Sequence, residues 1–178
     1  YYEIGHGCGN LLAYGVFDLN ENGSTKLLRQ GRFTNGELRS VDPAQITEYV
    51  GHSKYTPASG NRNPAAGLTE PDAAKPDAYS WIKSPRYLDL VHEAGPLARM
   101  YVNGDYRNGI SVLDRLAARA LEAKKVADAM DGWLNELTVG AASYQYTPTP
   151  RNATGIGLTE APRGALGHWI TIANGQID

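Results

Sequence analysis

The longest periodic pattern in the chain is a stripe of apolar and small residues that recurs at steps of three and four. Its members are Leu113, Leu116, Ala120, Ala123, Ala127, Met130, Leu134 and Leu137. Such spacing occupies one face of an α-helix, so the sequence predicts a long packing helix over about residues 111–137. Ser111 and Asp114 fit a capping box, which would mark the first turn of this helix. The alanines in the stripe favour close packing against a neighbouring helix.

Residues 1–40 show a different pattern, in which short β-favourable runs alternate with turn residues. Residues 14–19 and 25–29 flank a polar linker, which predicts a β-hairpin. The Asn-Gly dipeptide at 35–36 marks a second turn. Asp-Pro at 42–43 predicts the start of a short helix, because aspartate is a common N-cap and proline is tolerated in the first helical turn.

Towards the other end, residues 169–173 form a β run that is followed by Asn-Gly at 174–175, the strongest two-residue hairpin signal. The return strand has barely begun at Asp178. Half a hairpin is not a stable structure. We therefore expect the sequence to be part of a longer polypeptide that continues at both ends.

These segments together predict one partial domain over residues 1–178 with an α+β, mainly helical fold. This fold contains the long packing helix, and the β-hairpins lie at its periphery. The predicted parts, in chain order, are β- and turn-rich (1–40), loop-rich (56–78), helical (96–138), and a glycine-rich loop with a hairpin (155–178).

Composition and charge narrow the class of protein. Leu, Ile, Val and Phe make up just under one fifth of the chain, so the core is lean, and the net charge is −2. A near-neutral balance argues against binding to nucleic acid or to an anionic membrane by charge, and no apolar run is long enough to insert into a bilayer. The single cysteine, Cys8, excludes an internal disulfide and a metal site built from several thiolates within this chain.

The densest group of reactive side chains lies in residues 155–169, which hold four glycines and a proline around Glu160, Arg163 and His168. Glycine lets a ligand approach the main chain closely. Arginine is a charged fork of five donors, which suits an anionic or cyanide-like acceptor. A structural alternative is a loop in which Arg163 pairs with Glu160 and His168 caps a turn.

Residues 159–170, Thr-Glu-Ala-Pro-Arg-Gly-Ala-Leu-Gly-His-Trp-Ile, closely resemble the loop over the bimetallic centre in the large subunit of nickel–iron hydrogenases. Four other blocks resemble that family in the same order: residues 5–15, 79–86, 93–99 and 118–123. The resemblance covers essentially the whole chain and implies the central part of the large-subunit fold. One departure is Ala94, where the family more often has valine.

The resemblance implies reversible cleavage of H2 into protons and electrons at a Ni–Fe centre that carries CO and cyanide. In that family two Cys-x-x-Cys motifs, one near each end of the subunit, hold the metals. Neither motif is present here, so this chain would be an interior fragment, inactive by itself. The implied partner is a small subunit with iron–sulfur clusters, to which the electrons pass. The compartment stays open, because large subunits of this family lack an export signal of their own.

By motif, the resemblance places the Arg163 guanidinium over the open face of the metals and near a cyanide, as the catalytic residue. Pro162 would line the same pocket, and the backbone N–H of Ala161 would contact a cyanide. Glu160 and His168 would surround them. Whether Arg163 takes a proton from H2 or only positions and stabilises is left open by the motif.

A different reading is a non-catalytic scaffold or ion-pump subunit that descends from hydrogenases and has lost the metal cysteines. The coding sequence on either side of this segment discriminates between the two readings. Cys-x-x-Cys motifs in both flanks indicate the enzyme, and flanks without them indicate the scaffold.

Overall fold

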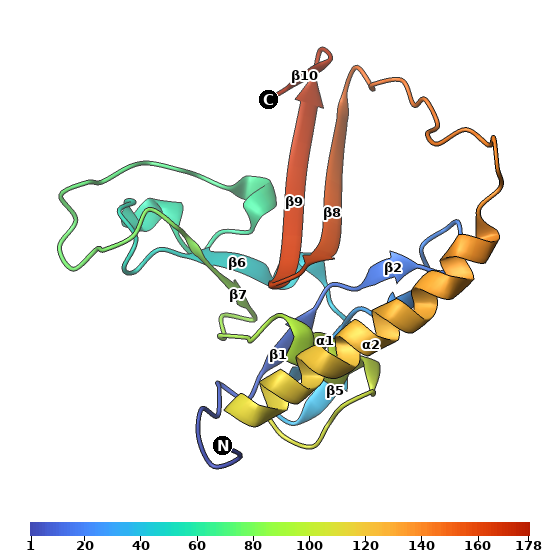
Figure 1. Ribbon diagram of the computed structural model, residues 1–178. Coiled ribbons are helices and arrows are strands. Elements are labelled where there is room, and N and C mark those ends of the chain that lie inside the picture. The colour runs from blue at the N-terminus through green and yellow to red at the C-terminus, as the bar shows by residue number, and fades with distance from the viewer.

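The computed structural model describes all residues 1–178 and contains two α-helices and ten β-strands (Figure 1). The helices are α1 (Pro96–Asn103) and α2 (Val112–Glu136). The strands are β1 (Leu11–Ala13), β2 (Val16–Asp18), β3 (Lys26–Leu28), β4 (Gly31–Thr34), β5 (Glu37–Arg39), β6 (Ile46–Tyr49), β7 (Ser84–Tyr87), β8 (Ala153–Ala161), β9 (Gly164–Ala173) and β10 (Gln176–Ile177). The α+β class is confirmed, but the prediction of a mainly helical fold is wrong.

Local turn signals account for the small antiparallel sheets of the first part. β2 pairs with β3 through Val16 and Leu28, which confirms the predicted first hairpin. β1, β4 and β5 form a second sheet, and Asn35 and Gly36 join β4 to β5 with φ values of 51° and 82°. Both turn residues are left-handed, as a type I′ hairpin requires.

The segment from Asp42 departs from the predicted short helix. Pro43–Gln45 forms a single 3₁₀ turn, capped by the Asp42 side chain, which accepts a hydrogen bond from the Ala44 N–H. The chain then becomes strand β6, which pairs with the distant strand β7. Pairing with β7 competes with continuation of the helix. Two further 3₁₀ turns, Pro57–Ser59 and Pro64–Ala66, interrupt the long connection between these strands.

The glycine-rich segment forms strands and not the exposed loop expected from its composition. β8 and β9 pair continuously from Ala153↔Ile172 to Ala161↔Gly164, which leaves only Pro162 and Arg163 in the turn. In Figure 1 this hairpin projects from the rest of the molecule with its turn directed inward. β10 returns beside β9, as the Asn-Gly signal at 174–175 predicts.

The structure confirms the long helix predicted over residues 111–137, as α2, and the predicted capping box at its start. The Ser111 hydroxyl accepts from the Asp114 N–H, and the Asp114 carboxylate accepts from the Ser111 N–H at 2.7 Å. The predicted packing face is wrong, however. Asp114 and Ala118 are buried, whereas Leu116 is 55% exposed and most of the predicted stripe is uncovered. The short helix α1 packs on the first part of α2 along the face of Ala118. The remaining part has no helical neighbour, although Trp133 packs against Phe17 of β2 with ring centroids 5.2 Å apart.

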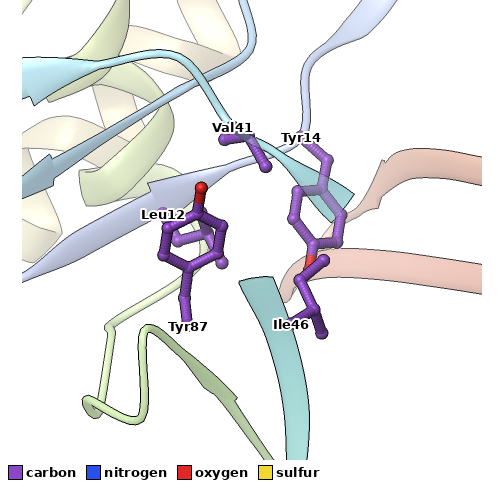
Figure 2. Close-up of a cluster of buried hydrophobic side chains, with 5 residues drawn as sticks. All are labelled: Leu12, Tyr14, Val41, Ile46 and Tyr87. Atoms are coloured by element: carbon purple, nitrogen blue, oxygen red, sulfur yellow. The ribbon is translucent and has the colours of Figure 1, made fainter. Parts of the chain in front are cut away.

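Two small clusters make up the hydrophobic core, in keeping with the lean composition. The first, shown in Figure 2, consists of Leu12, Tyr14, Val41, Ile46 and Tyr87. The side chains of Leu158, Ala165 and Trp169 pack against it and attach the β8–β9 hairpin. The second cluster joins α1 to α2 and consists of Leu28, Leu97, Met100, Tyr106 and Ala118. Neither helix combines the length and the apolar character needed to cross a bilayer.

Candidate functional site

The turn between β8 and β9 carries the central residue predicted from the sequence. Arg163 and Pro162 are exposed, and Ala161 is half-buried at the last pair of the ladder. Arg163 faces a cavity of about 270 Å³. The residues that line this cavity are Glu93, Ala94, Pro96, Leu97, Arg115, Arg119, Pro162 and Arg163.

Arg99, from helix α1, lies directly beneath this turn and is buried. Its Nε and Nη2 donate to the two carboxylate oxygens of Glu122 at 2.5 and 2.8 Å. Its Nη1 donates to Glu160 at 2.8 Å. The remaining hydrogens point to the carbonyls of Ala161 and Pro162, each at 3.1 Å. All five guanidinium donors are therefore used, three on carboxylates and two on the main chain of the turn.

Glu160 is the most buried member of this cluster, with 1% of its side chain exposed. Its second oxygen accepts the backbone N–H of Tyr14 at 2.5 Å. The partner of Glu160 is thus Arg99, and the predicted alternative in which Arg163 pairs with Glu160 is wrong. Glu160 ties the hairpin to β1 and to α1 at the same point.

Burial and hydrogen bonding act in opposite directions on these charges. Burial disfavours the charged form of Arg99, but the hydrogen bonds with Glu122 and Glu160 outweigh it and raise the pKa of Arg99. Burial raises the pKa of Glu160, against the effect of the Tyr14 N–H and the Arg99 guanidinium. Burial and the nearby Glu160 charge raise the pKa of Tyr14 to about 12. Arg99 thus stays a cation throughout the physiological pH range.

Backbone packing holds the turn from a second side. Gly95, at the N-terminus of α1, has φ 114°, and a Cβ placed there would lie 2.8 Å from the Arg163 carbonyl oxygen. A Cβ on Gly164 would lie 2.9 Å from the Ala94 Cβ. Both positions need glycine because the two backbones are in close contact. The block at 93–99 therefore packs directly against the turn that carries Arg163.

The opposite wall of the cavity is also cationic. Arg115 of α2 forms a two-point ion pair with Glu93 at 2.6 and 2.7 Å. Arg119 follows one helical turn later and also lines the cavity. One guanidinium is therefore neutralised by Glu93, while Arg119 and Arg163 give the cavity a positive character. Such a wall suits an acceptor or an anion.

The structure does not bring His168 to the turn. His168 pairs with Gly157 in the ladder, four pairs away from the last pair, Ala161↔Gly164, and its side chain is exposed. It does not line the cavity of Arg163. Of the residues predicted around the site, Glu160, Ala161, Pro162 and Arg163 gather at the turn.

Sequence reasoning missed the roles of Arg99 and Glu122, although both lie in blocks that it identified. The available signal was the buried face of α1, on which Arg99 is the one charged residue among apolar neighbours. A buried arginine requires carboxylate partners. The partners of Arg99 are Glu122 and Glu160, but both lie far from it in the sequence. No local pattern therefore distinguished them from the other carboxylates of the chain.

This chain does not bring together a set of metal ligands. No group of three or more His, Cys, Asp or Glu side chains is arranged to hold a metal ion. Cys8 is exposed. What the turn and its cavity offer are hydrogen-bond donors and positive charge.

The comparisons with known proteins agree over the whole chain. The family model described as nickel-dependent hydrogenase matches residues 1–109 and 103–178. The large subunit of the periplasmic [NiFeSe] hydrogenase of Desulfomicrobium baculatum is 34% identical, with 99% of this chain and 39% of that protein covered. The hydrogenase-1 large chain of Escherichia coli is 32% identical with the same coverage.

Solved structures give the same result. The reduced, active form of the Desulfomicrobium baculatum enzyme matches with a TM-score of 0.92 and 34% identity, over 99% of this chain and 41% of that chain. The reduced enzyme of Desulfovibrio vulgaris Hildenborough also has a TM-score of 0.92, at 33% identity over 99% of this chain and 42% of that chain. The chain thus spans about two fifths of the length of these relatives. It belongs to the nickel-dependent hydrogenase family.

Proposed function

We propose that this chain is the interior part of the catalytic large subunit of a nickel–iron hydrogenase, an oxidoreductase that interconverts H2 with protons and electrons. Family membership and the hydrogenase names of the relatives support the reaction class. The observation that carries the proposal is the exposed Arg163 at a tightly held turn beside a cationic cavity.

The residues present fit the surroundings of a Ni–Fe centre and not its ligand shell. Cys8 is the single thiol of the chain, so the ligand cysteines belong to other parts of the subunit. When bound, the centre supplies the metal site at which H2 is split. From this chain, the Arg163 guanidinium and the Ala161 N–H would be the donors to the cyanide ligands, whose nitrogen is an acceptor.

Arg163 contributes a fixed positive charge and several donors. A guanidinium has no acceptor, so its role in the proposal is to orient and stabilise negative charge that develops in the cavity. Pro162 fixes the direction of the chain before it and has no N–H to compete for an acceptor. Glu160 acts through Arg99, which holds the turn. His168 lies further along the ladder, and the proposal gives it no role at the turn.

The proposed partner is a small subunit with iron–sulfur clusters, since the relatives are named as large subunits or large chains of hydrogenases. The electrons from H2 would leave through it. The far part of α2 leaves apolar side chains such as Leu134 uncovered, at 64% exposure. In the whole protein, the rest of the large subunit and the small subunit would cover such surfaces.

The test is Arg163→Lys in the full-length heterodimer. We expect a loss of H2 oxidation of about a hundredfold or more, the usual effect of removing one preorganised donor, with nickel and iron content unchanged. Arg151→Lys, at an exposed position before β8, is the matched control and should leave both unchanged. Loss of the metals from Arg163→Lys would instead make Arg163 a structural residue and contradict its proposed role.

A further inference from the structure

We propose that Arg99 is the positioning residue for the turn that carries Arg163, and that Gly95 sets the other side of the same turn. The inference rests on the proposed function, because it assigns a purpose to the placement of Arg163. It concerns two residues of α1 that lie outside the turn itself.

The hydrogen bonds from Arg99 fix two successive peptide groups. Nη1 holds the Ala161 carbonyl and Nη2 holds the Pro162 carbonyl, each at 3.1 Å. All peptide bonds in the chain are trans, so the N–H of Arg163 points away from Arg99 when the Pro162 carbonyl points toward it. The fork of Arg99 therefore determines how the backbone presents Arg163 to the cavity.

Two carboxylates fix the fork in turn. Glu122 binds Nε and Nη2 from α2, and Glu160 binds Nη1 from β8. Only 4% of the Arg99 side chain is exposed, so water does not compete for these bonds. The planar guanidinium contacts α2, β8 and the turn at the same time. A lysine ammonium with a single charged nitrogen cannot make all of these contacts.

Gly95 completes the arrangement through direct backbone contact. A Cβ there would lie 2.8 Å from the Arg163 carbonyl oxygen, closer than real contacts allow, and the φ of 114° already requires glycine. Gly95 and Arg99 are linked, since the Gly95 carbonyl accepts the Arg99 N–H at 3.0 Å. One helical turn thus presents both contacts to the tip of the hairpin.

The experiment is Arg99→Lys in the full-length heterodimer, with three measurements: metal content, H2 oxidation and the infrared bands of metal-bound cyanide. Lysine retains the positive charge toward Glu122 and Glu160 but loses the fork. We expect unchanged nickel and iron, a shift of the cyanide bands, and a fall in H2 oxidation of about a hundredfold, the size of a 1 Å misplacement. Lys125→Met is the control, since it removes another ion pair of α2, with Asp105, that does not reach the turn.

Gly95→Ala provides a second, independent variant. It leaves the Arg99 side chain intact but pushes on the Arg163 carbonyl, so it should shift the cyanide bands and reduce turnover in the same way. Unchanged bands and turnover in Arg99→Lys would overturn the proposal. So would loss of the metals from Arg99→Lys, because Arg99 would then be required for assembly and not for placement of the turn.

The double variant separates this inference from the proposed function. If Arg99 acts through Arg163, adding Arg99→Lys to Arg163→Lys should cost little beyond the single substitution. Independent, multiplying losses would show that Arg99 acts by another route and overturn the inference alone. Full activity of Arg163→Lys by itself would contradict the proposed function, whatever the result for Arg99.

Discussion

The two ends of the β8–β9 hairpin are built from the same continuous ladder but are held very differently. At the turn end, Glu160 has 1% of its side chain exposed and Arg99 donates to two backbone carbonyls. Towards the open end, Ile156 of β8 is 54% exposed, and Ile177 of β10, which pairs with Ile172 of β9, is 76% exposed. Strand pairing is common to both ends, so it cannot be what fixes the position of the turn. The buried ion pairs, together with the packing of Leu158 and Ala165 on the first core cluster, provide that difference.

Helix α2 repeats the contrast. Its first two turns are anchored by the Ser111–Asp114 capping box and by Ala118, which is completely buried against α1. Its last turns leave Leu134 largely exposed. Both long elements therefore have their most buried contacts at the end nearest to the Arg163 cavity.

The largest expected effect comes from Glu160→Ala in the full-length subunit. Arg99 keeps its ion pair with Glu122, but removing Glu160 leaves one Nη1 hydrogen of Arg99 and the Tyr14 N–H without their buried acceptor. Local unfolding of the turn end should therefore become easier by about 3 kcal/mol. Native-state hydrogen exchange of the β8 and β9 amides measures this free energy. Glu37→Ala removes the exposed pair with Arg39 and should cost less than about 1 kcal/mol. Equal effects of the two substitutions would show that the buried contacts of Glu160 stabilise the turn end no more than an exposed ion pair does.

A smaller effect is expected from Ala118→Leu, which overpacks the contact between α1 and α2. Extra methylene groups in a close-packed site typically cost about 2 kcal/mol. Ala120→Leu, on the exposed side of the same helix, is the matched control and should change stability by less than about 0.5 kcal/mol. Hydrogen exchange over residues 112–124 distinguishes them, and a neutral Ala118→Leu would mean that the two helices do not pack closely.

Asp114→Asn tests the anchored start of α2 and its pH dependence. Burial acts to raise the pKa of Asp114, but hydrogen bonds from Ser111 and Tyr106 outweigh it and lower that pKa below its usual range. The stabilisation is therefore complete above the unfolded pKa of about 3.9 and is lost as the pH falls through the lower folded value. The substitution should cost about 1 kcal/mol at neutral pH and remove this acid dependence, measured as exchange of the first-turn amides between pH 3 and 7.

The smallest effect is expected at the open end of the hairpin, where Ile156→Thr should change stability by less than about 0.5 kcal/mol. The exposed side chain loses little burial when it is replaced. The measurement is exchange of the β8 amides near residue 156 in the full-length subunit. A cost above about 1 kcal/mol would show that another part of the subunit packs on this end. The difference between the two ends of the hairpin would then not hold in the whole subunit.

Local signals in the sequence were sufficient for the β2–β3 hairpin, the Asn-Gly turns and the range and capping box of α2. They failed where the structure depends on contacts between residues far apart in the sequence. Periodicity identified the apolar stripe of α2 but not that the short helix α1 packs on a different face. Glycine content suggested a loop at 155–169, although pairing along the whole ladder makes it two strands.

The candidate site shows the same division. Arg163 and its neighbours were found from their motif, which is contiguous. The contacts that hold them join Arg99 to residues 23 and 61 positions away, and no local pattern encodes such pairs. The charged residue on the buried face of α1 was the one local indication that a partner was needed.

The chain order of the Arg99 cluster has a consequence for synthesis. Arg99 and Glu122 leave the ribosome before Glu160, so the guanidinium can pair with α2 while β8 is still being made. The hydrogen bonds to the carbonyls of Ala161 and Pro162 form only when the hairpin docks. The wall of the cavity therefore cannot be complete before the β8–β9 hairpin has been synthesised, whereas the pairing of α1 with α2 is possible earlier.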